Sequence, residues 1–263
     1  MHSALLLPAL SSVSSRAEML PLATCLGAAW ECVVADWPGF GDAPRAGRDG
    51  LHPEMLDVFL DRLIGRAPAP FALGVGAGHA APYLVRAALR HPARFARLVL
   101  IAPTWRGPLP TMLGASRLTR AARRAFEAPG FGPLLYRAAT SRRMLERMMR
   151  GHVYADPATV TPALLAAKRA IVRQPGARFA TAAFISGGLD PVHSRAAFLA
   201  LFGAGLPPTL MLRPRGAPRK SAAEMDALGA TGHVTRVEVP GALSAHEEYP
   251  DAAATAIRDW LPG

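Results

Sequence analysis

The sequence predicts an α/β fold, in which a mostly parallel sheet is flanked by helices and carries an inserted helical cap. Short β-type runs alternate with helical segments over most of the chain, which is the pattern of a parallel sheet covered on both faces. This alternation stops after Thr104 and resumes near Pro207. A chain of 263 residues, 51% of them hydrophobic, is long enough to bury such a core.

Six short apolar runs have the length and composition of strands, at residues 4–7, 31–35, 71–75, 97–102, 209–212 and 234–239. Helices are expected between them, at residues 16–26, 53–64, 80–90, 194–201, 221–228 and 250–261. We therefore assign residues 1–104 and 208–263 to the core, and residues 105–207 to the cap.

The cap is expected to be helical, with glycine and proline at its breaks. Its apolar residues recur at the spacing of one helix face, as in Leu134, Leu135, Ala138, Leu145, Met148 and Met149. The cap also carries the charge, because residues 106–180 hold fourteen basic and three acidic side chains, a net charge equal to the +11 of the whole chain. Three interpretations stay open for this charge: a cap whose arginines face solvent, a surface for an anionic membrane or acidic partner, and a nucleic-acid site, which the few aromatic residues disfavour.

A strand-to-helix corner is predicted at Phe71-Ala-Leu-Gly-Val-Gly-Ala-Gly-His-Ala-Ala81, where an apolar run leads directly into a helical segment. Two registers place either Gly78 or Gly76 at the tip of this corner. Gly78 is preferred because it leaves a strand of ordinary length before the turn. The same residues fit the dinucleotide fingerprint G-x-G-x-x-A, but residues 96–104 lack the acidic side chain that a ribose requires.

Four segments resemble the α/β-hydrolase superfamily, and they occur in the order that this family shows. Asp36-Trp-Pro-Gly-Phe-Gly-Asp42 is similar to the loop before the nucleophile elbow, and the loop around Ala9 lies where the family donates an oxyanion-hole amide. Leu98-Val-Leu-Ile-Ala-Pro-Thr104 resembles the strand after the elbow, and Gly241-Ala-Leu-Ser-Ala-His-Glu-Glu-Tyr-Pro250 resembles the loop of the catalytic histidine. The resemblance implies a hydrolase scaffold with His246 as the acid–base residue.

The sequence departs from the family at two of the three catalytic positions. The elbow motif G-x-S-x-G has glycine at its centre, Gly78, so the nucleophilic serine is missing. Residues 213–220, which follow the strand that bears the family's acid, contain no carboxylate. Asp190, Glu224 and Glu247 remain as candidates to orient His246.

Backbone amides are expected to survive as an oxyanion cradle beside the corner, at His79 and in the loop with Ala9, Ser11 and Ser12. Ser11 or Ser12 as a substitute nucleophile, and His79 as a side chain facing the site, are weaker alternatives.

A substrate pocket is expected around Trp105 and Arg106, at the carboxyl edge of the sheet, and such a pair suits an anionic or flat molecule. Asp36 is included in this pocket, with a role in organising its own loop as the alternative.

Two hypotheses for function follow. The first is a hydrolase or lyase for a small molecule with an ester, acyl or enolisable carbonyl group, with His246 and the amide cradle as its machinery. The second is a pseudoenzyme that binds a ligand, a membrane or an acidic partner through its basic cap.

No metal or cofactor is expected, since His193, His233 and His246 do not have the spacing of metal ligands. Lacking a membrane span and a secretory signal, the protein is expected in the cytoplasm.

Overall fold

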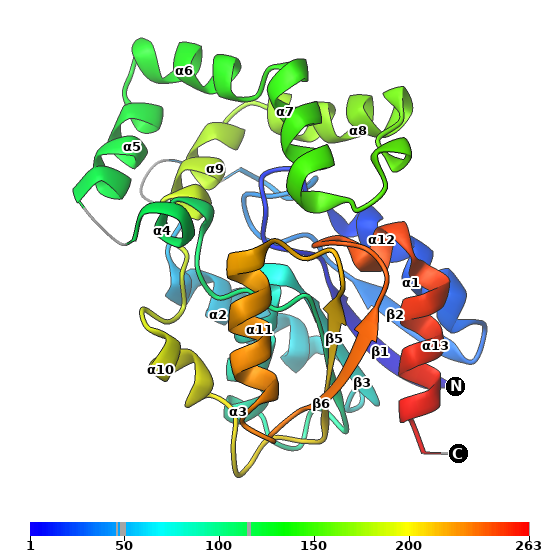
Figure 1. Cartoon of the computed structure of the whole chain (residues 1–263). Coiled ribbons are helices and arrows are strands. Elements are labelled where there is room, and N and C mark those ends of the chain that lie inside the picture. The colour runs from blue at the N-terminus through cyan, green and yellow to red at the C-terminus, as the bar shows by residue number, and fades with distance from the viewer. Residues whose placement is uncertain (46, 48–50, 115–116, 263) are drawn as a thin grey trace.

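The computed structural model describes residues 1–45, 47, 51–114 and 117–262, and its centre is one six-stranded sheet. The strand order is β2-β1-β3-β4-β5-β6, and all five pairings are parallel (Figure 1). The strands are β1 (His2–Leu7), β2 (Trp30–Val34), β3 (Leu73–Ala77), β4 (Leu98–Ile101), β5 (Thr209–Pro214) and β6 (Thr235–Val239). All six predicted strands are confirmed. The strand predicted at residues 71–75 lies two residues later in the structure, as β3, and it ends directly before Gly78.

Helices cover both faces of the sheet (Figure 1). One face is covered by α1 (Leu20–Leu26) and α13 (Pro250–Trp260), and the other by α2 (Pro53–Arg66), α3 (Ala81–Arg90) and α11 (Arg219–Gly229). The short helix α10 (Arg195–Leu199) packs its Phe198 into the same core as α3. Two shorter elements matter for the site: the 3-10 helix η1 (Arg16–Met19), which precedes α1, and α12 (Ala245–Glu248), which precedes α13.

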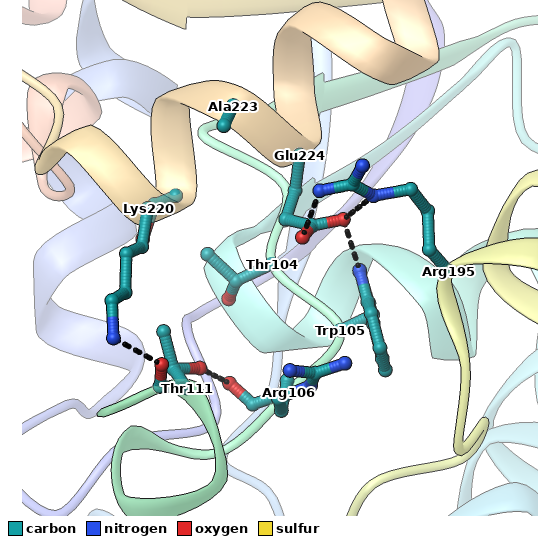
Figure 2. A pocket seen from close by; sticks show the side chains of 9 residues that line it. Thr104, Trp105, Arg106, Thr111, Arg195, Lys220, Ala223 and Glu224 are labelled. Atoms are coloured by element: carbon teal, nitrogen blue, oxygen red, sulfur yellow. Dashed lines mark hydrogen bonds and ion pairs between the residues drawn. The ribbon is translucent and has the colours of Figure 1, made fainter. Parts of the chain in front are cut away.

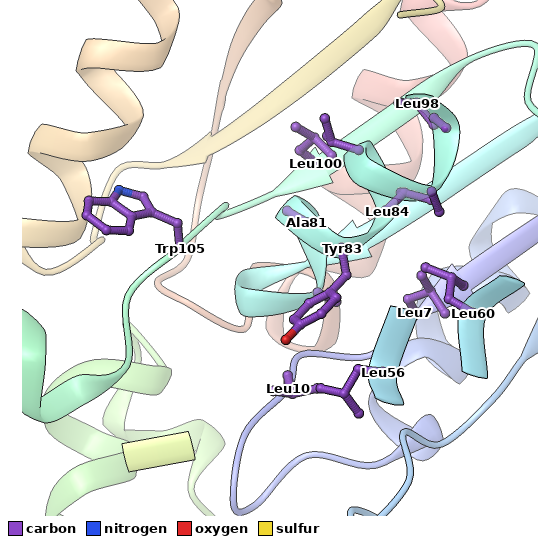
Figure 3. Packing of buried hydrophobic residues seen from close by; sticks show 14 of the residues in the cluster. Leu7, Leu10, Leu56, Leu60, Ala81, Tyr83, Leu84, Leu98, Leu100 and Trp105 are labelled. Atoms are coloured by element: carbon purple, nitrogen blue, oxygen red, sulfur yellow. The ribbon is translucent and has the colours of Figure 1, made fainter. Parts of the chain in front are cut away.

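The alternation of side chains along β1 explains the two halves of the core. Leu5 and Leu7 point to the face covered by α2 and α3, and Ala4 and Leu6 point to the face covered by α1 and α13. Figure 3 shows the first of these clusters, with Leu7 of β1 near Leu60 of α2. Because both faces are buried, the strands are continuously apolar, and that property made them recognisable in the sequence.

The cap lies beyond the carboxyl ends of the strands (Figure 1). Its helices are α4 (Pro108–Leu113), α5 (Arg117–Glu127), α6 (Phe131–Ala139), α7 (Arg142–Met148), α8 (Pro162–Arg173) and α9 (Ala177–Ile185), with a π-helical turn η3 (Met149–Val153) and a 3-10 turn η4 (Pro157–Thr159) before α8. Helices α5 to α9 contribute to a separate hydrophobic cluster, which also takes in Val13 from the loop after β1. The cap is thus anchored on the loop that leads to the site.

The cap differs from the sequence prediction in how its apolar residues are used. Leu145 and Met149 are buried as expected, but α6 and α7 are separate helices, so the predicted residues do not share one continuous face. Leu134 is 63% exposed, and two further apolar side chains that the pattern did not include, Phe131 and Met144, are 62% and 50% exposed. The outer surface of the cap is therefore both apolar and basic.

No helix within the described ranges combines the length and the apolar character needed to cross a bilayer.

Candidate functional site

The corner between β3 and α3 has Gly78 at its tip. β3 ends at Ala77, Gly78 adopts a φ of +51°, and a single 3-10 turn, η2 (Gly78–Ala80), leads into α3. A left-handed residue at this point turns the chain sharply without the strain that a side chain would add, which is of order 1–3 kcal/mol. The preferred register of the corner is therefore confirmed.

The ends of three neighbouring strands meet at this tip. A Cβ atom added to Gly78 would lie 3.3 Å from Cβ of Ala9, in the loop after β1, and 3.9 Å from Oγ1 of Thr104, in the loop after β4. The Thr104 N–H also donates to the carbonyl oxygen of Gly78 over 3.1 Å. Ala102, just before it, has a positive φ of 47°, which is uncommon for a residue with a side chain and is a form of strain often found at sites.

His246 lies in α12 and is completely buried. Its Nε2 atom is 3.4 Å from Oε1 of Glu18, which is also completely buried and comes from η1. Within the described residues, neither ring nitrogen of His246 makes a hydrogen bond of good geometry. The carboxylate beside His246 is thus Glu18, and none of the three acids proposed from the sequence.

Glu18 also occupies the loop amide on which the predicted cradle depends. The Ala9 N–H donates to Glu18 Oε1 over 2.6 Å, so one carboxylate oxygen contacts both this amide and His246. The sequence predicted that this amide is free to bind a substrate. In the structure it instead donates to the carboxylate of Glu18.

A lysine from the cap completes this buried cluster. Nζ of Lys168, on α8, lies 2.9 Å from Oε2 of Glu247 and 3.7 Å from Oε2 of Glu18. The hydroxyl of Tyr154 donates to the same Glu247 oxygen over 2.7 Å. The cluster of Glu18, His246, Lys168, Glu247 and Tyr154, which we term the Glu18 cluster, therefore joins η1, α12 and the cap.

The charges in the cluster determine which of its acidic groups, the Glu18 carboxyl and the Tyr154 hydroxyl, is ionised. Burial alone would raise the pKa of Glu18, but contacts with His246, Lys168 and the Ala9 amide outweigh burial and lower that pKa below its usual value. Burial and the neighbouring Glu247 carboxylate raise the pKa of Tyr154, which stays protonated and donates its hydrogen. Glu18 is consequently an anion at neutral pH.

His79, the residue after the tip, is buried and points toward the end of the cap. Its Nε2 lies 3.2 Å from the carbonyl oxygen of Leu189 and 3.2 Å from Oδ1 of Asp190. The same Asp190 oxygen accepts the Gly107 N–H over 2.8 Å, which ties the start of the cap to its end. Asp190 thus partners His79 instead of His246, and the His79 side chain joins the corner to the base of the cap.

Among the other predicted residues, the side chains of Ser11 and Asp36 accept hydrogen bonds from backbone N–H groups. The Ser11 hydroxyl accepts the Val13 N–H over 3.5 Å, and across the described residues nothing links the hydroxyl of Ser11 or Ser12 to His246. The Asp36 carboxylate accepts the N–H of Arg16 over 2.5 Å and that of Asp42 over 2.9 Å. Asp36 therefore fixes the start of η1, the element that carries Glu18.

A cavity of about 280 Å³ opens beside Thr104, between the base of the cap and α11 (Figure 2). Trp105 and Arg106 line it as predicted, whereas Asp36 does not. Its other lining residues are Thr111, Arg195, Lys220, Ser221, Ala223 and Glu224. The Arg106 guanidinium lies 4.2 Å from the centre of the Trp105 ring, a cation–π contact.

Glu224 neutralises only part of the positive charge in this cavity. It accepts two hydrogen bonds from Arg195, at 2.9 and 2.8 Å, and one from the Trp105 indole at 3.1 Å. The hydrogen bond from Arg195 is the main reason that the pKa of Glu224 is lowered. Because three cationic side chains, Arg106, Arg195 and Lys220, line the cavity together with one carboxylate, the cavity suits an anionic ligand.

Sequence reasoning missed Glu18 and Lys168. One signal was available in each case: Glu18 follows directly on the loop that resembles an oxyanion loop, and Lys168 is one of only two lysines among thirty basic residues. Neither signal says that the two side chains meet.

No protein-family model and no curated protein matches the sequence. Solved structures do match the fold over almost the whole chain. A thermophilic esterase from Thermogutta terrifontis is 19% identical with a TM-score of 0.71, covering 99% of this chain and 89% of the esterase. The enol-lactonase from Burkholderia xenovorans LB400 is 16% identical with a TM-score of 0.73, covering 98% of this chain and 91% of the lactonase. A probable hydrolytic enzyme from Pseudomonas aeruginosa PAO1 is 16% identical with a TM-score of 0.74, covering 100% of this chain and 86% of that enzyme. The parallel sheet, the corner at Gly78 and these likenesses together identify the chain as a protein with the α/β-hydrolase fold.

Proposed function

We propose that this protein is a hydrolase or lyase for a small molecule with an ester, lactone or enolisable carbonyl group. His246 would act as the acid–base residue, and no covalent intermediate would form at the corner. The observation that carries the proposal is the position of His246, which is buried at the carboxyl edge of the sheet next to the Glu18 carboxylate, and the same carboxylate oxygen binds the Ala9 amide. The esterase and the enol-lactonase with the same fold support this substrate class.

The chemistry would follow from the groups present. Gly78 has no side chain, so His246 would take a proton either from a water molecule as its oxygen adds to the carbonyl carbon, or from the carbon next to the carbonyl. In the first case the C–O bond to the alcohol would then break and His246 would give the proton to the leaving alcohol; in the second it would return the proton to the product. Negative charge would then develop on the carbonyl oxygen. The N–H groups of His79 and Ala9 would stabilise this oxyanion, the second of them after Glu18 has withdrawn.

The cavity beside Thr104 supports an anionic substrate. One of its lining residues, Thr104, has its Oγ1 atom 3.9 Å from a Cβ built on Gly78, and the cationic side chains that line the cavity outnumber the one carboxylate among them. An acid or phosphate group of the substrate would bind near Arg106 and Arg195, and the carbonyl would point toward the corner.

Replacing His246 by alanine tests the acid–base role. We expect a loss of at least about 100-fold in the rate on 4-nitrophenyl esters and enol lactones, the usual contribution of a general acid or base. His233→Ala, at an exposed histidine on the same chain, is the control and should keep full activity. Equal activity of the His246→Ala and wild-type proteins, with circular dichroism showing both folded, would exclude this mechanism.

A second candidate function is favoured by the outer surface of the cap. Six of the large hydrophobic side chains exposed in the described residues lie there, namely Met112, Leu113, Leu118, Phe131, Leu134 and Met144. Exposed arginines flank them, including Arg142, Arg143 and Arg147, which form no ion pair within the described part of the chain. Apolar and basic side chains on one surface are the makeup of a protein that binds at the interface of an anionic membrane.

Binding to vesicles tests this surface. We expect the protein to bind phosphatidylserine-containing vesicles in preference to neutral phosphatidylcholine vesicles, and Arg142→Gln with Arg143→Gln to weaken this binding about 30-fold, from about 1 kcal/mol per arginine. Arg62→Gln with Arg66→Gln, at exposed positions on α2, is the matched control. Equal binding to the anionic and neutral vesicles, or an equal loss of vesicle binding in both double variants, would refute a membrane role for the cap.

A further inference from the structure

We propose that the Glu18 cluster is a binding site for a small carboxylate, and that the chain's own Glu18 side chain fills this site in the present structure. The inference goes beyond the proposed function, because such a site exists whether or not the protein turns over a substrate.

Three donors from three separate elements converge on one carboxylate. Oε1 of Glu18 accepts the Ala9 N–H over 2.6 Å and faces Nε2 of His246 at 3.4 Å. Oε2 lies 3.7 Å from Nζ of Lys168. Glu18 is completely buried and the Lys168 side chain is 6% exposed, so these donors face a carboxylate that is shielded from solvent. Such a set of a backbone amide, an imidazole and an ammonium group is suited to binding a carboxylate from any source.

The cluster keeps unused hydrogen-bonding capacity, which a purely structural ion pair would rarely retain. Among the described residues, Oε2 of Glu18 and both ring nitrogens of His246 are buried without a hydrogen bond. Unpaired buried polar groups are costly, and their presence commonly marks a functional site. The ring nitrogens of His246 are therefore available to a ligand that meets them with better geometry than Glu18 does, and the unpaired Oε2 shows that Glu18 itself does not satisfy the site fully.

The position of the cluster connects it to the tip of the corner. Ala9, whose N–H binds Glu18, is also the residue whose Cβ lies 3.3 Å from a Cβ built on Gly78. The site also reaches the cap, because Lys168 belongs to α8. A carboxylate ligand that displaced Glu18 would therefore lie against the corner and pair with a cap residue.

Shortening the Glu18 side chain tests the site, because each truncation leaves a space that matches a free carboxylate of known size. Glu18→Ala removes the atoms of acetate, and Glu18→Gly removes those of propionate. We expect about 100 mM acetate to raise the Tm of Glu18→Ala by about 3 to 6 °C over chloride of equal ionic strength, the shift given by a tenfold excess of ligand over its Kd. Propionate should be the better ligand for Glu18→Gly.

Two controls make the result specific. Glu18→Gln keeps the volume of the side chain and should not respond to acetate, and adding His246→Ala to Glu18→Ala should reduce the response. If Glu18→Ala is unfolded on its own, acetate should restore its circular dichroism spectrum, because a ligand of the folded state shifts the folding equilibrium. The proposal is overturned if neither truncated variant is stabilised or refolded by acetate or propionate, or if Glu18→Gln responds equally. Loss of turnover in His246→Ala would not alter either outcome, so the two proposals fail separately.

Discussion

Replacing Lys168 by methionine is expected to lower the free energy of unfolding by about 3 to 5 kcal/mol at pH 7, because it removes one partner of a buried ion pair. Lys168 faces two carboxylates, with Nζ 2.9 Å from Glu247 and 3.7 Å from Glu18. Methionine keeps much of the length of the side chain, so the loss reflects charge more than packing. Urea unfolding followed by tryptophan fluorescence measures the change.

The effect of this substitution should depend on pH, and its direction follows from Glu18. The pKa of Glu18 is lowered in the folded protein, so its ionisation contributes stability that is present above the pKa of the unfolded chain and is lost as the pH falls through the folded pKa. Lys168 supplies part of that lowering. The variant should therefore approach the wild type in stability only as the pH falls below about 4.5 and through the lowered pKa of Glu18 in the folded wild type, where that carboxylate becomes protonated.

The chain offers a matched control in Lys220, its other lysine. Lys220 is exposed and donates to the carbonyl oxygens of Thr111 and Met112 at 3.1 and 3.0 Å. Lys220→Met should cost less than about 1 kcal/mol, as is usual at the surface. A loss for Lys168→Met that stays constant from pH 7 down through the pH range in which Glu18 binds its proton would mean that Lys168 stabilises the protein through its aliphatic stem and not through its charge.

The sheet and the corner could be predicted from sequence because local patterns determine them. Each strand is a short apolar run, and burial on both faces requires that pattern whatever the partner strands are. Gly78 was placed at the tip from the elbow motif that the segment resembles and from the run of strand length before it, and the structure gives it a positive φ, which glycine tolerates. Such properties lie within one short stretch of neighbouring residues.

The Glu18 cluster could not be predicted, because it exists only through tertiary contacts. Glu18, Lys168 and His246 are separated by 150 and 78 positions in the chain and come from η1, α8 and α12. The family pattern directed attention to an acid after β5, but Arg213, near the end of that strand, pairs with Asp226, and the acid beside His246 comes from η1 instead. A glutamate in a helical segment near the N-terminus has no sequence feature that separates it from a solvent-exposed one.

Placing a serine at the corner should produce a reactive nucleophile, but only when Glu18 is also removed. We expect Gly78→Ser combined with Glu18→Ala to be labelled by a fluorophosphonate probe at the introduced hydroxyl, and Gly78→Ser alone to react about 100-fold more slowly. The reason is that Glu18 occupies the Ala9 amide, and one oxyanion donor is worth about 10²- to 10³-fold in rate. Mass spectrometry of the labelled peptide locates the probe and measures both rates.

The backbone at Gly78 allows the substitution at a limited cost. Among the described residues other than its two chain neighbours, a Cβ atom there meets only Ala9 and Thr104 within 4 Å, so the main penalty is the strain of a side chain at a φ of +51°, about 1 to 3 kcal/mol. Ala80→Ser, two residues further along the same turn, adds a hydroxyl away from the tip and should stay unlabelled. If Gly78→Ser is labelled equally fast with and without Glu18, the carboxylate does not compete with the oxyanion for the Ala9 amide. Labelling of Ser11 or Ser12 in the wild type would assign the nucleophile to the loop after β1. Faster labelling in the double variant would instead mean that Glu18 occupies the oxyanion position at the Ala9 amide, next to a corner whose backbone still allows a nucleophile.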